Sequence, residues 1–485
     1  MENSKLITHL SALTTNEMRR FGEFVDSPFF NKHEDTKKLF EILRENKDRW
    51  ARITKQEVYA LIFSDKYQEF KINNLMFNLM ELLKEFLGQL EYSQSNGKSD
   101  FVLKGTLNRW MWKLFEDNSK KERDELESIR IKDQDYFERV FQLERFIDQS
   151  IIMRGRKHTP VYFEKMEEAL EIGFILNKLK NGCDMLNRMM IFNYKYDLGI
   201  LNLLLPYIKE RWSFFGEIPT INIYYRVLYT FLEPDQHNRF FELVEFIEKN
   251  RSQINTEDLT LIYRYAINNG IQLLNVDEKN FSRGTFRLYQ AMIKDGLHLE
   301  NNEIRDMDFK NIVTLACRLK EFDWTKWFMD AHRGNLNVEF RKNTYNFCMA
   351  FYYYNQQNYQ EALVLLSKLN YKNAFYLINA KSMQIKIFYE LKEYDLLLSF
   401  LESYRLFLIR NKKISPSRIN INQNFVKYTR KFIQLLNSKE AYSKKNFHEH
   451  LLKLKVELLE TKAPMLNKDW LLENLEEVIQ RKSLP

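Results

Sequence analysis

The sequence predicts an all-α protein in which a helical N-terminal module is followed by a solenoid of helical hairpins. The chain of 485 residues contains only 13 glycines and 8 prolines, too few for a sheet-rich fold with many tight turns. Aliphatic, aromatic and sulphur-containing residues make up 45% of it, which is enough for an extensive core. An aromatic residue also recurs in short polar turns at intervals typical of helix–turn–helix arrays.

Residues 1–95 are the predicted N-terminal module. A capping box, in which a threonine and the glutamate three residues later satisfy each other's backbone N–H groups, marks the start of a helix. The pattern occurs at Thr14 with Glu17 and again at Thr54 with Glu57. Because the residue before a proline disfavours the helical conformation, the first of these helices is expected to end near Ser27-Pro28.

The next helix of the module is expected to have Asp35 as its cap, since a carboxylate suits that position. Farther along, apolar residues at spacings of three and four mark one face of a single helix. They are Ile72, Leu75, Met76, Leu79, Leu82, Leu83, Phe86 and Leu87. The polar segment from Tyr92 to Asp100 is the expected boundary of the module.

Residues 100–200 are expected to form a connecting region of amphipathic helices. Arg154 to His158 make a basic turn before Pro160. Such a turn either contacts a phosphate or an acidic partner, or it lies solvated in a loop, and the sequence leaves both interpretations open.

Residues 201–405 are the predicted hairpin repeats. An aromatic residue in a short turn precedes an apolar helix five times, with intervals of 41, 41, 37 and 35 residues. The five are Phe240, Phe281, Phe322, Tyr359 and Tyr394. One such hairpin cannot bury both of its faces, so neighbouring hairpins are expected to stack.

The segment from Asn343 to Lys372 resembles a tetratricopeptide repeat. That family places a small residue where paired helices approach, an aromatic three residues later and an alanine early in the second helix. Here these places hold Ala350, Tyr353 and Ala362, with Leu366 one turn further. In the next, degenerate unit the matching residues are Ile385, Phe388 and Leu397.

The resemblance covers residues 220–405 and implies a right-handed solenoid with a concave groove that binds a peptide or partner helix. Polar and aromatic residues expected near that groove are Tyr353, Asn355, Gln356 and Gln357. Phe286 to Trp327 resembles the related pentatricopeptide pattern, which implies binding of single-stranded RNA. The opening segment Ser27–Lys32 resembles openings of uncharacterised bacterial proteins, which implies no function.

Residues 406–485 are expected to form a basic helical cap. Ser415-Pro416 starts a helix, and Leu471, Leu475 and Val478 mark a final amphipathic one. Although the whole chain carries only +8, the stretch from Arg405 to Lys445 holds eleven basic residues and one acidic residue, Glu440. The candidate basic patch consists of Arg410, Lys412, Lys413, Lys427, Arg430 and Lys431.

This basic segment has two interpretations. It contacts a nucleic-acid backbone or an acidic protein, or it is a cationic solvated face above an apolar core. The second interpretation is favoured by the spacing of its aromatic residues, which suits a core rather than stacking platforms. These residues are Tyr404, Phe407, Phe425, Tyr428 and Phe432.

Catalytic, cofactor and metal motifs are missing from the sequence. It contains no glycine-rich phosphate-binding loop and no Gly-x-Ser-x-Gly elbow. His448 and His450 are two apart, so on a helix they point in different directions. The cysteines Cys183, Cys317 and Cys348 are widely spaced, which suits a reducing compartment better than a zinc or disulfide framework.

The sequence therefore predicts a non-catalytic scaffold that binds a partner protein or peptide, without cofactor or metal. The alternative is an RNA-binding helical-repeat protein that uses the basic segment 405–445. No signal peptide and no run of eighteen apolar residues is present, so the expected location is cytoplasmic, without a membrane span.

Overall fold

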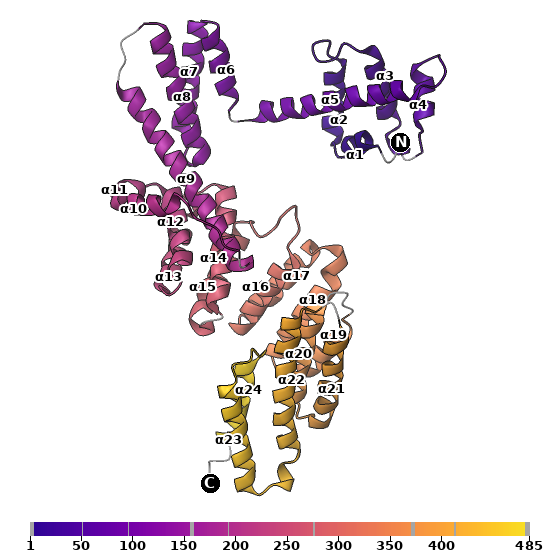
Figure 1. Ribbon diagram of the computed structural model, residues 1–485, viewed down its shortest axis with the longest axis vertical. Coiled ribbons are helices and arrows are strands. Elements are labelled where there is room, and N and C mark those ends of the chain that lie inside the picture. Colours follow the sequence, from indigo (N-terminus) through magenta and orange to yellow (C-terminus); the bar gives the residue numbers. More distant parts are fainter. Residues whose placement is uncertain are drawn as a thin grey trace. The chain divides into compact units, whose positions relative to one another are not determined.

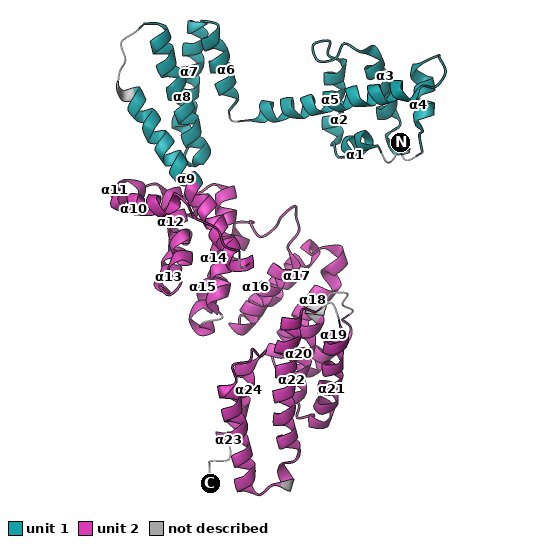
Figure 2. Ribbon diagram, in the orientation of Figure 1, with its two compact units in different colours: residues 1–177 teal, residues 178–485 magenta. Residues whose placement is uncertain are grey.

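The computed structural model of the chain describes residues 4–50, 52–95, 97–155, 160–192, 194–274, 277–369, 374–411 and 414–480. Within these ranges the protein is all-α, with α-helices α1–α24, four short 3-10 helices and no β-strand (Figure 1). This confirms the all-α part of the predicted fold class. The chain divides into two compact units, residues 1–177 and 178–485 (Figure 2). Helix α9 (Pro160–Phe192) contains residues of both.

The first five helices of unit 1 share one core. They are α1 (Lys5–Ser11), α2 (Thr15–Asp26), α3 (Glu34–Glu45), α4 (Lys55–Ile62) and α5 (Glu69–Gln94), with a 3-10 turn at Lys47–Arg49. Phe21, Leu39 and Leu79 are fully buried at its centre. Both predicted capping boxes are present, at the starts of α2 and α4. Helix α2 ends at Asp26, directly before Ser27-Pro28, as predicted.

The prediction that Asp35 caps a helix is wrong. Helix α3 begins at Glu34, with His33 in the capping position. The buried Asn31 explains this start, because its side chain donates to the Val25 carbonyl (3.0 Å) and accepts from the His33 backbone N–H (2.9 Å). Asp35 lies instead in the first turn of α3, where a negative charge favours the helix N-terminus.

The predicted stripe on α5 is buried, with two departures. Met76 is half-buried and Leu87 is 42% exposed, whereas the other six residues lie in the core. The rest of unit 1 consists of α6 (Lys98–Asn108), α7 (Trp112–Ser128), α8 (Gln134–Met153) and the beginning of α9. Helices α6, α7 and α8 pack together around a second core that includes Leu103, Phe115 and Phe146.

Unit 2 continues with α9 and a succession of paired helices. The helices up to α15 are α10 (Leu201–Glu210), α11 (Trp212–Phe215), α12 (Pro219–Leu232), α13 (Asn238–Asn250), α14 (Thr256–Leu274) and α15 (Glu278–Lys294). Those that follow are α16 (Asp306–Arg318), α17 (Phe322–His332), α18 (Val338–Asn355), α19 (Tyr359–Ser367), α20 (Ala374–Glu390) and α21 (Tyr394–Arg410). Two 3-10 turns lie at Arg251–Gln253 and Arg333–Asn335.

The five turn aromatics all lie at the start of the second helix of a pair. Phe322, Tyr359 and Tyr394 are the first residues of α17, α19 and α21. Phe240 and Phe281 lie within the first four residues of α13 and α15. The Phe240 ring occupies space left by Gly284, where a Cβ would lie 2.8 Å from that ring. These aromatics therefore lie in the first turn of the second helix, next to the turn that joins the two helices of a pair.

The turns before α17, α19 and α21 have the same backbone conformation. Two residues before each aromatic, Lys320, Gln357 and Lys392 have φ of 61°, 63° and 60°, in the left-handed region. The next residue donates its N–H to a carbonyl five residues earlier, as Asn358 does to Tyr353 (2.9 Å). This is a Schellman-type helix ending. The same geometry recurs in unit 1 at Trp110, where φ is 56°.

The C-terminal helices are α22 (Pro416–Asn437), α23 (Lys444–Glu460) and α24 (Lys468–Gln480), with a 3-10 turn at Lys439–Ala441. Helix α22 has Ser415 in the capping position and proline as its first residue, as predicted. The final helix buries Leu471 and Leu475 completely, which confirms the predicted amphipathic helix.

A buried polar junction ties α9, α12 and α14 together within unit 2. The Asp258 carboxylate accepts from the Tyr224 hydroxyl (2.6 Å) and the Asn255 amide (3.1 Å). It also pairs with the Lys180 ammonium at 2.8 Å, and the Asp258 side chain is only 4% exposed. Burial, followed by the nearby Asp258 charge, raises the pKa of Tyr224 well above its usual value. The Tyr224 hydroxyl therefore remains a hydrogen-bond donor.

Candidate functional site

An open groove of about 390 Å³ runs along α18 and α19. It is lined by Tyr345, Asn346, Met349 and Tyr353 of α18 and by Gln360, Glu361, Val364 and Leu365 of α19. Tyr345, Met349 and Tyr353 are four residues apart, so they form one row about 12 Å long on the face of α18. Val364 is 51% exposed at its edge. The groove thus offers an accessible apolar surface between two amide-bearing rims.

The helix pair that carries this groove is held by its own core. Ala350 and Ala362 are fully buried, which agrees with the small residues expected where the helices approach. The turn at Gln357 then returns the chain antiparallel to α18. Val364 and Gln360 are exposed and Tyr345 and Tyr353 are half-buried, so these side chains are available for contact, whereas Met349 is buried beneath them.

The upstream end of the groove is fixed by a polar cluster from α17. The Tyr345 hydroxyl donates to Asp330 (2.8 Å), and Asp330 also pairs with Lys326 (2.5 Å). These two bonds lower the pKa of Asp330, whereas burial and then Asp330 raise the pKa of Tyr345. The Arg333 guanidinium lies 4.6 Å from the centre of the Tyr345 ring. Tyr345 is therefore held in one orientation at this end of the groove.

Of the four candidate partner-binding residues, the structure places only Tyr353 in the groove. Asn355 donates its side-chain amide to the Phe351 carbonyl (2.7 Å) at the end of α18. Gln356 and Gln357 form the turn. The sequence reasoning missed Met349, Val364 and Leu365, although their spacing from Tyr345, Tyr353 and Gln360 marks the same helix faces.

Basic residues of the segment 405–445 form ion pairs with acidic residues outside it. Arg430 pairs with Glu402 (2.9 Å) and Lys431 with Glu457 (2.7 Å), two acids outside residues 405–445. Lys427 is exposed and lies 5.2 Å from the Tyr428 ring. Arg410 is also exposed, while Lys412 and Lys413 lie outside the described residues.

The aromatic residues of the basic segment belong to the core. Tyr404, Phe425 and Phe432 are fully buried and Tyr428 is 6% exposed. Tyr404 donates its hydroxyl to the buried Asn422 (2.8 Å). These four buried rings cannot stack on nucleobases, whereas Phe407 is half-buried against the same core.

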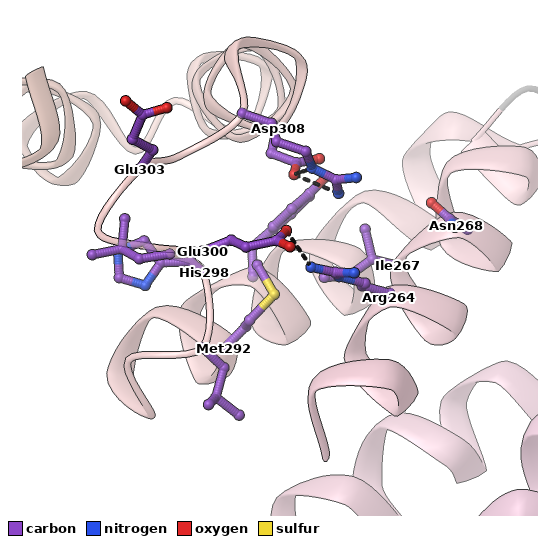
Figure 3. Close-up of a pocket in the computed structure, with 12 residues that line it drawn as sticks. Arg264, Ile267, Asn268, Met292, His298, Glu300, Glu303 and Asp308 are labelled. Carbon is purple, nitrogen blue, oxygen red and sulfur yellow. Dashed lines mark hydrogen bonds and ion pairs between the residues drawn. The ribbon is translucent and has the colours of Figure 1, made fainter. Parts of the chain in front are cut away.

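A second, smaller cavity of about 40 Å³ lies beside the loop between α15 and α16 (Figure 3). Arg264 reaches across it to Glu300 (3.1 Å). His298 contacts His332 through ring nitrogens 3.3 Å apart. Burial and the neighbouring His332 lower the pKa of His298 to about 4. A cavity of this size holds a few waters and not an organic ligand.

The described residues contain no group of three or more His, Cys, Asp or Glu side chains placed to hold a metal ion. The three cysteine side chains are buried and free, and burial raises the pKa of the Cys317 thiol to about 12. Such thiols are poor nucleophiles at neutral pH. No helix in this part of the chain is both long and apolar enough to cross a membrane.

Comparison with known proteins gives no relative: no protein-family model, no curated protein and no solved structure matches this chain. The site must therefore be interpreted from its own geometry. That geometry is an apolar groove on a rigid helix pair.

Proposed function

We propose that the protein is a non-catalytic, cytoplasmic interaction scaffold whose α18–α19 groove binds apolar anchor residues of a partner peptide or helix. The observation that carries this proposal is the groove itself. Its row of Tyr345, Met349 and Tyr353 is about 12 Å long, which matches three apolar side chains spaced four residues apart on a partner helix. The amides of Asn346 and Gln360 supply hydrogen bonds at its rims.

The proposal includes a right-handed, tetratricopeptide-like arrangement of the helix pairs from α12 to α21. It is supported by the regular place of the turn aromatics and by the identical turns before α17, α19 and α21. Buried Ala350 and Ala362 add to this support. In the degenerate next pair, Ile385 and Leu397 are buried at the matching places, where larger side chains replace the small ones.

The test is a quantitative pull-down with the full chain from a lysate of the source organism, comparing Val364→Glu with Val456→Glu. The two valines are matched, since they are 51% and 50% exposed, but Val456 lies on α23, away from the groove lining. A charge in an apolar contact loses at least about tenfold in affinity. We expect one protein to be retained by the wild type and by Val456→Glu and lost with Val364→Glu. Equal retention by both variants would contradict the proposal.

The same experiment separates the nucleic-acid alternative. A triple variant with Glu at Lys427, Arg430 and Lys431 reverses the basic face and is expected to leave the protein partner bound. If instead RNA is recovered with the wild type, falls steeply with salt and disappears with the triple variant, the basic segment is the functional surface.

A further inference from the structure

One turn in unit 1 has the backbone of three turns in unit 2 but a different surface. Before α7, α17, α19 and α21, the residue at the left-handed position has φ between 56° and 63°. The residue after it has φ between −84° and −80° and ψ between 58° and 67° in all four. The turn is thus one structure that recurs four times.

The four turns differ in the polarity of the two residues at their centre. The three turns of unit 2 carry Lys320-Glu321, Gln357-Asn358 and Lys392-Glu393, which are polar. The turn in unit 1 carries Trp110-Met111 instead. Trp110 is 59% exposed, Met111 47% and the nearby Leu114 49%. A bulky residue is unfavourable in the left-handed region. The structure of the turn therefore gives no reason for this apolar tip, formed by Trp110, Met111 and Leu114.

The apolar tip is held rigidly. Trp110 and Met111 donate their backbone N–H groups to Leu107 (3.1 Å) and Thr106 (3.0 Å). The Trp110 ring packs edge-on against Trp112, with centroids 5.4 Å apart. The Arg154 guanidinium in turn lies over the Trp112 ring, 4.4 Å from the ring centroid. A side chain fixed in this way loses little conformational entropy when it meets a partner surface.

The charged residues within 101–115, the segment that contains the apolar tip, are all basic. Residues 101–115 contain Lys104, Arg109 and Lys113 and no acidic residue. All three are exposed, and none is in an ion pair with another described residue. The nearest following acid, Glu116, is paired with Arg154 (2.5 Å). The tip is therefore an exposed apolar turn with three nearby cations that form no ion pair with another described residue, while the exposed Asp117 lies three residues after Leu114 on α7.

We propose that this tip binds the surface of a bilayer that contains anionic phospholipid. Trp, Met and Leu would enter the interfacial region, where tryptophan is favoured, while Lys104, Arg109 and Lys113 meet the negative headgroups. An exposed apolar turn without an acidic residue of its own suits a continuous anionic surface, whereas a protein pocket would require a specific complementary shape. This activity lies in unit 1 and is independent of the groove in unit 2.

The experiment is flotation of the full chain with vesicles of phosphatidylcholine, with or without phosphatidylglycerol. The test variant is Trp110→Lys with Met111→Glu, which installs the Lys-Glu pair of two equivalent turns and so preserves the fold. We expect binding to the anionic vesicles that weakens with salt, and at least about a tenfold loss in the variant. Lys320→Gly, at an equivalent turn, is expected to bind as the wild type does.

Three results would overturn the proposal. They are no binding of the wild type to anionic vesicles, equal binding of the Trp110→Lys, Met111→Glu variant, and equal binding to pure phosphatidylcholine. Absence of vesicle binding would assign the tip to a protein surface. A loss produced by Lys427→Glu, with the tip variant unaffected, would move membrane binding to the basic C-terminal helices and equally refute it.

Discussion

Replacing Asp258 by alanine tests the buried junction that joins α9, α12 and α14. The change leaves the Tyr224 hydroxyl, in a side chain with no exposed surface, without its acceptor. It also removes the partner of Lys180, whose side chain is 23% exposed. Leaving the buried Tyr224 hydroxyl without a hydrogen-bond partner lowers the free energy of unfolding by about 1–3 kcal/mol. The loss of the ion pair with Lys180 lowers it by less than the loss of a fully buried ion pair would, because the Lys180 ammonium is partly hydrated. We therefore expect a loss of about 3 kcal/mol.

The assay is differential scanning calorimetry together with hydrogen exchange in α12 and α14. Since the chain has two units, the local exchange rates report the effect more directly than one unfolding free energy does. For a unit of this size the loss corresponds to a fall in Tm of about 5 °C. The control is Asp258→Leu with Lys180→Met and Tyr224→Phe, which removes the polar groups together and should regain most of the stability.

The reasoning would be refuted by unchanged exchange in α12 and α14 of the Asp258→Ala variant. It would also be refuted if the triple variant were as unstable as the single one. That result would mean that Asp258 acts through packing rather than through the groups that it binds.

Two further predictions concern a turn and a pair of histidines. Gln357 occupies the left-handed region, so Gln357→Gly should stabilise unit 2 by about 1 kcal/mol. The neighbouring Gln356 has φ of −91°, so Gln356→Gly should destabilise the unit by about 0.5–1 kcal/mol. Equal thermal shifts for the two variants would contradict this prediction. Burial lowers the pKa of both His298 and His332 below the usual 6.5, to about 4 for His298. Stability from these neutral rings is therefore complete above pH 6.5 and is lost as the pH falls toward 4. The Tm of the wild type should fall more over this pH range than the Tm of His298→Gln. An equal fall in Tm for the two proteins would contradict this prediction.

Local signals in the sequence predicted the local structure well. The Thr14 and Thr54 capping boxes and the Ser415-Pro416 helix start depend on a few neighbouring residues, and all three helices begin where expected. Asp35 failed as a cap because Asn31, a residue with no strong helix signal, anchors the preceding loop through tertiary contacts. The turn at Trp110 does not follow the predicted pattern, because Trp110-Met111 is apolar whereas the predicted turns are polar.

The surfaces were harder to predict because they depend on residues distant in sequence. Arg430 and Lys431 looked unpaired, but their partners Glu402 and Glu457 lie 28 and 26 residues away. The groove was predicted only through Tyr353, since the family resemblance marks hairpin positions and not the faces that stay exposed. Met349 and Val364 become neighbours only when α18 and α19 pair.

The measurement that tests the central claim most directly is site-specific photo-crosslinking from the groove. p-Benzoylphenylalanine would replace Val364 in one variant and Val456 in the other, and the products would be mapped by mass spectrometry. The account predicts that the Val364 position crosslinks one protein, at apolar residues about four apart in its sequence, and that the Val456 position does not. Crosslinks of equal yield to the same protein from both positions, or from neither, would contradict the assignment of the groove as the binding site.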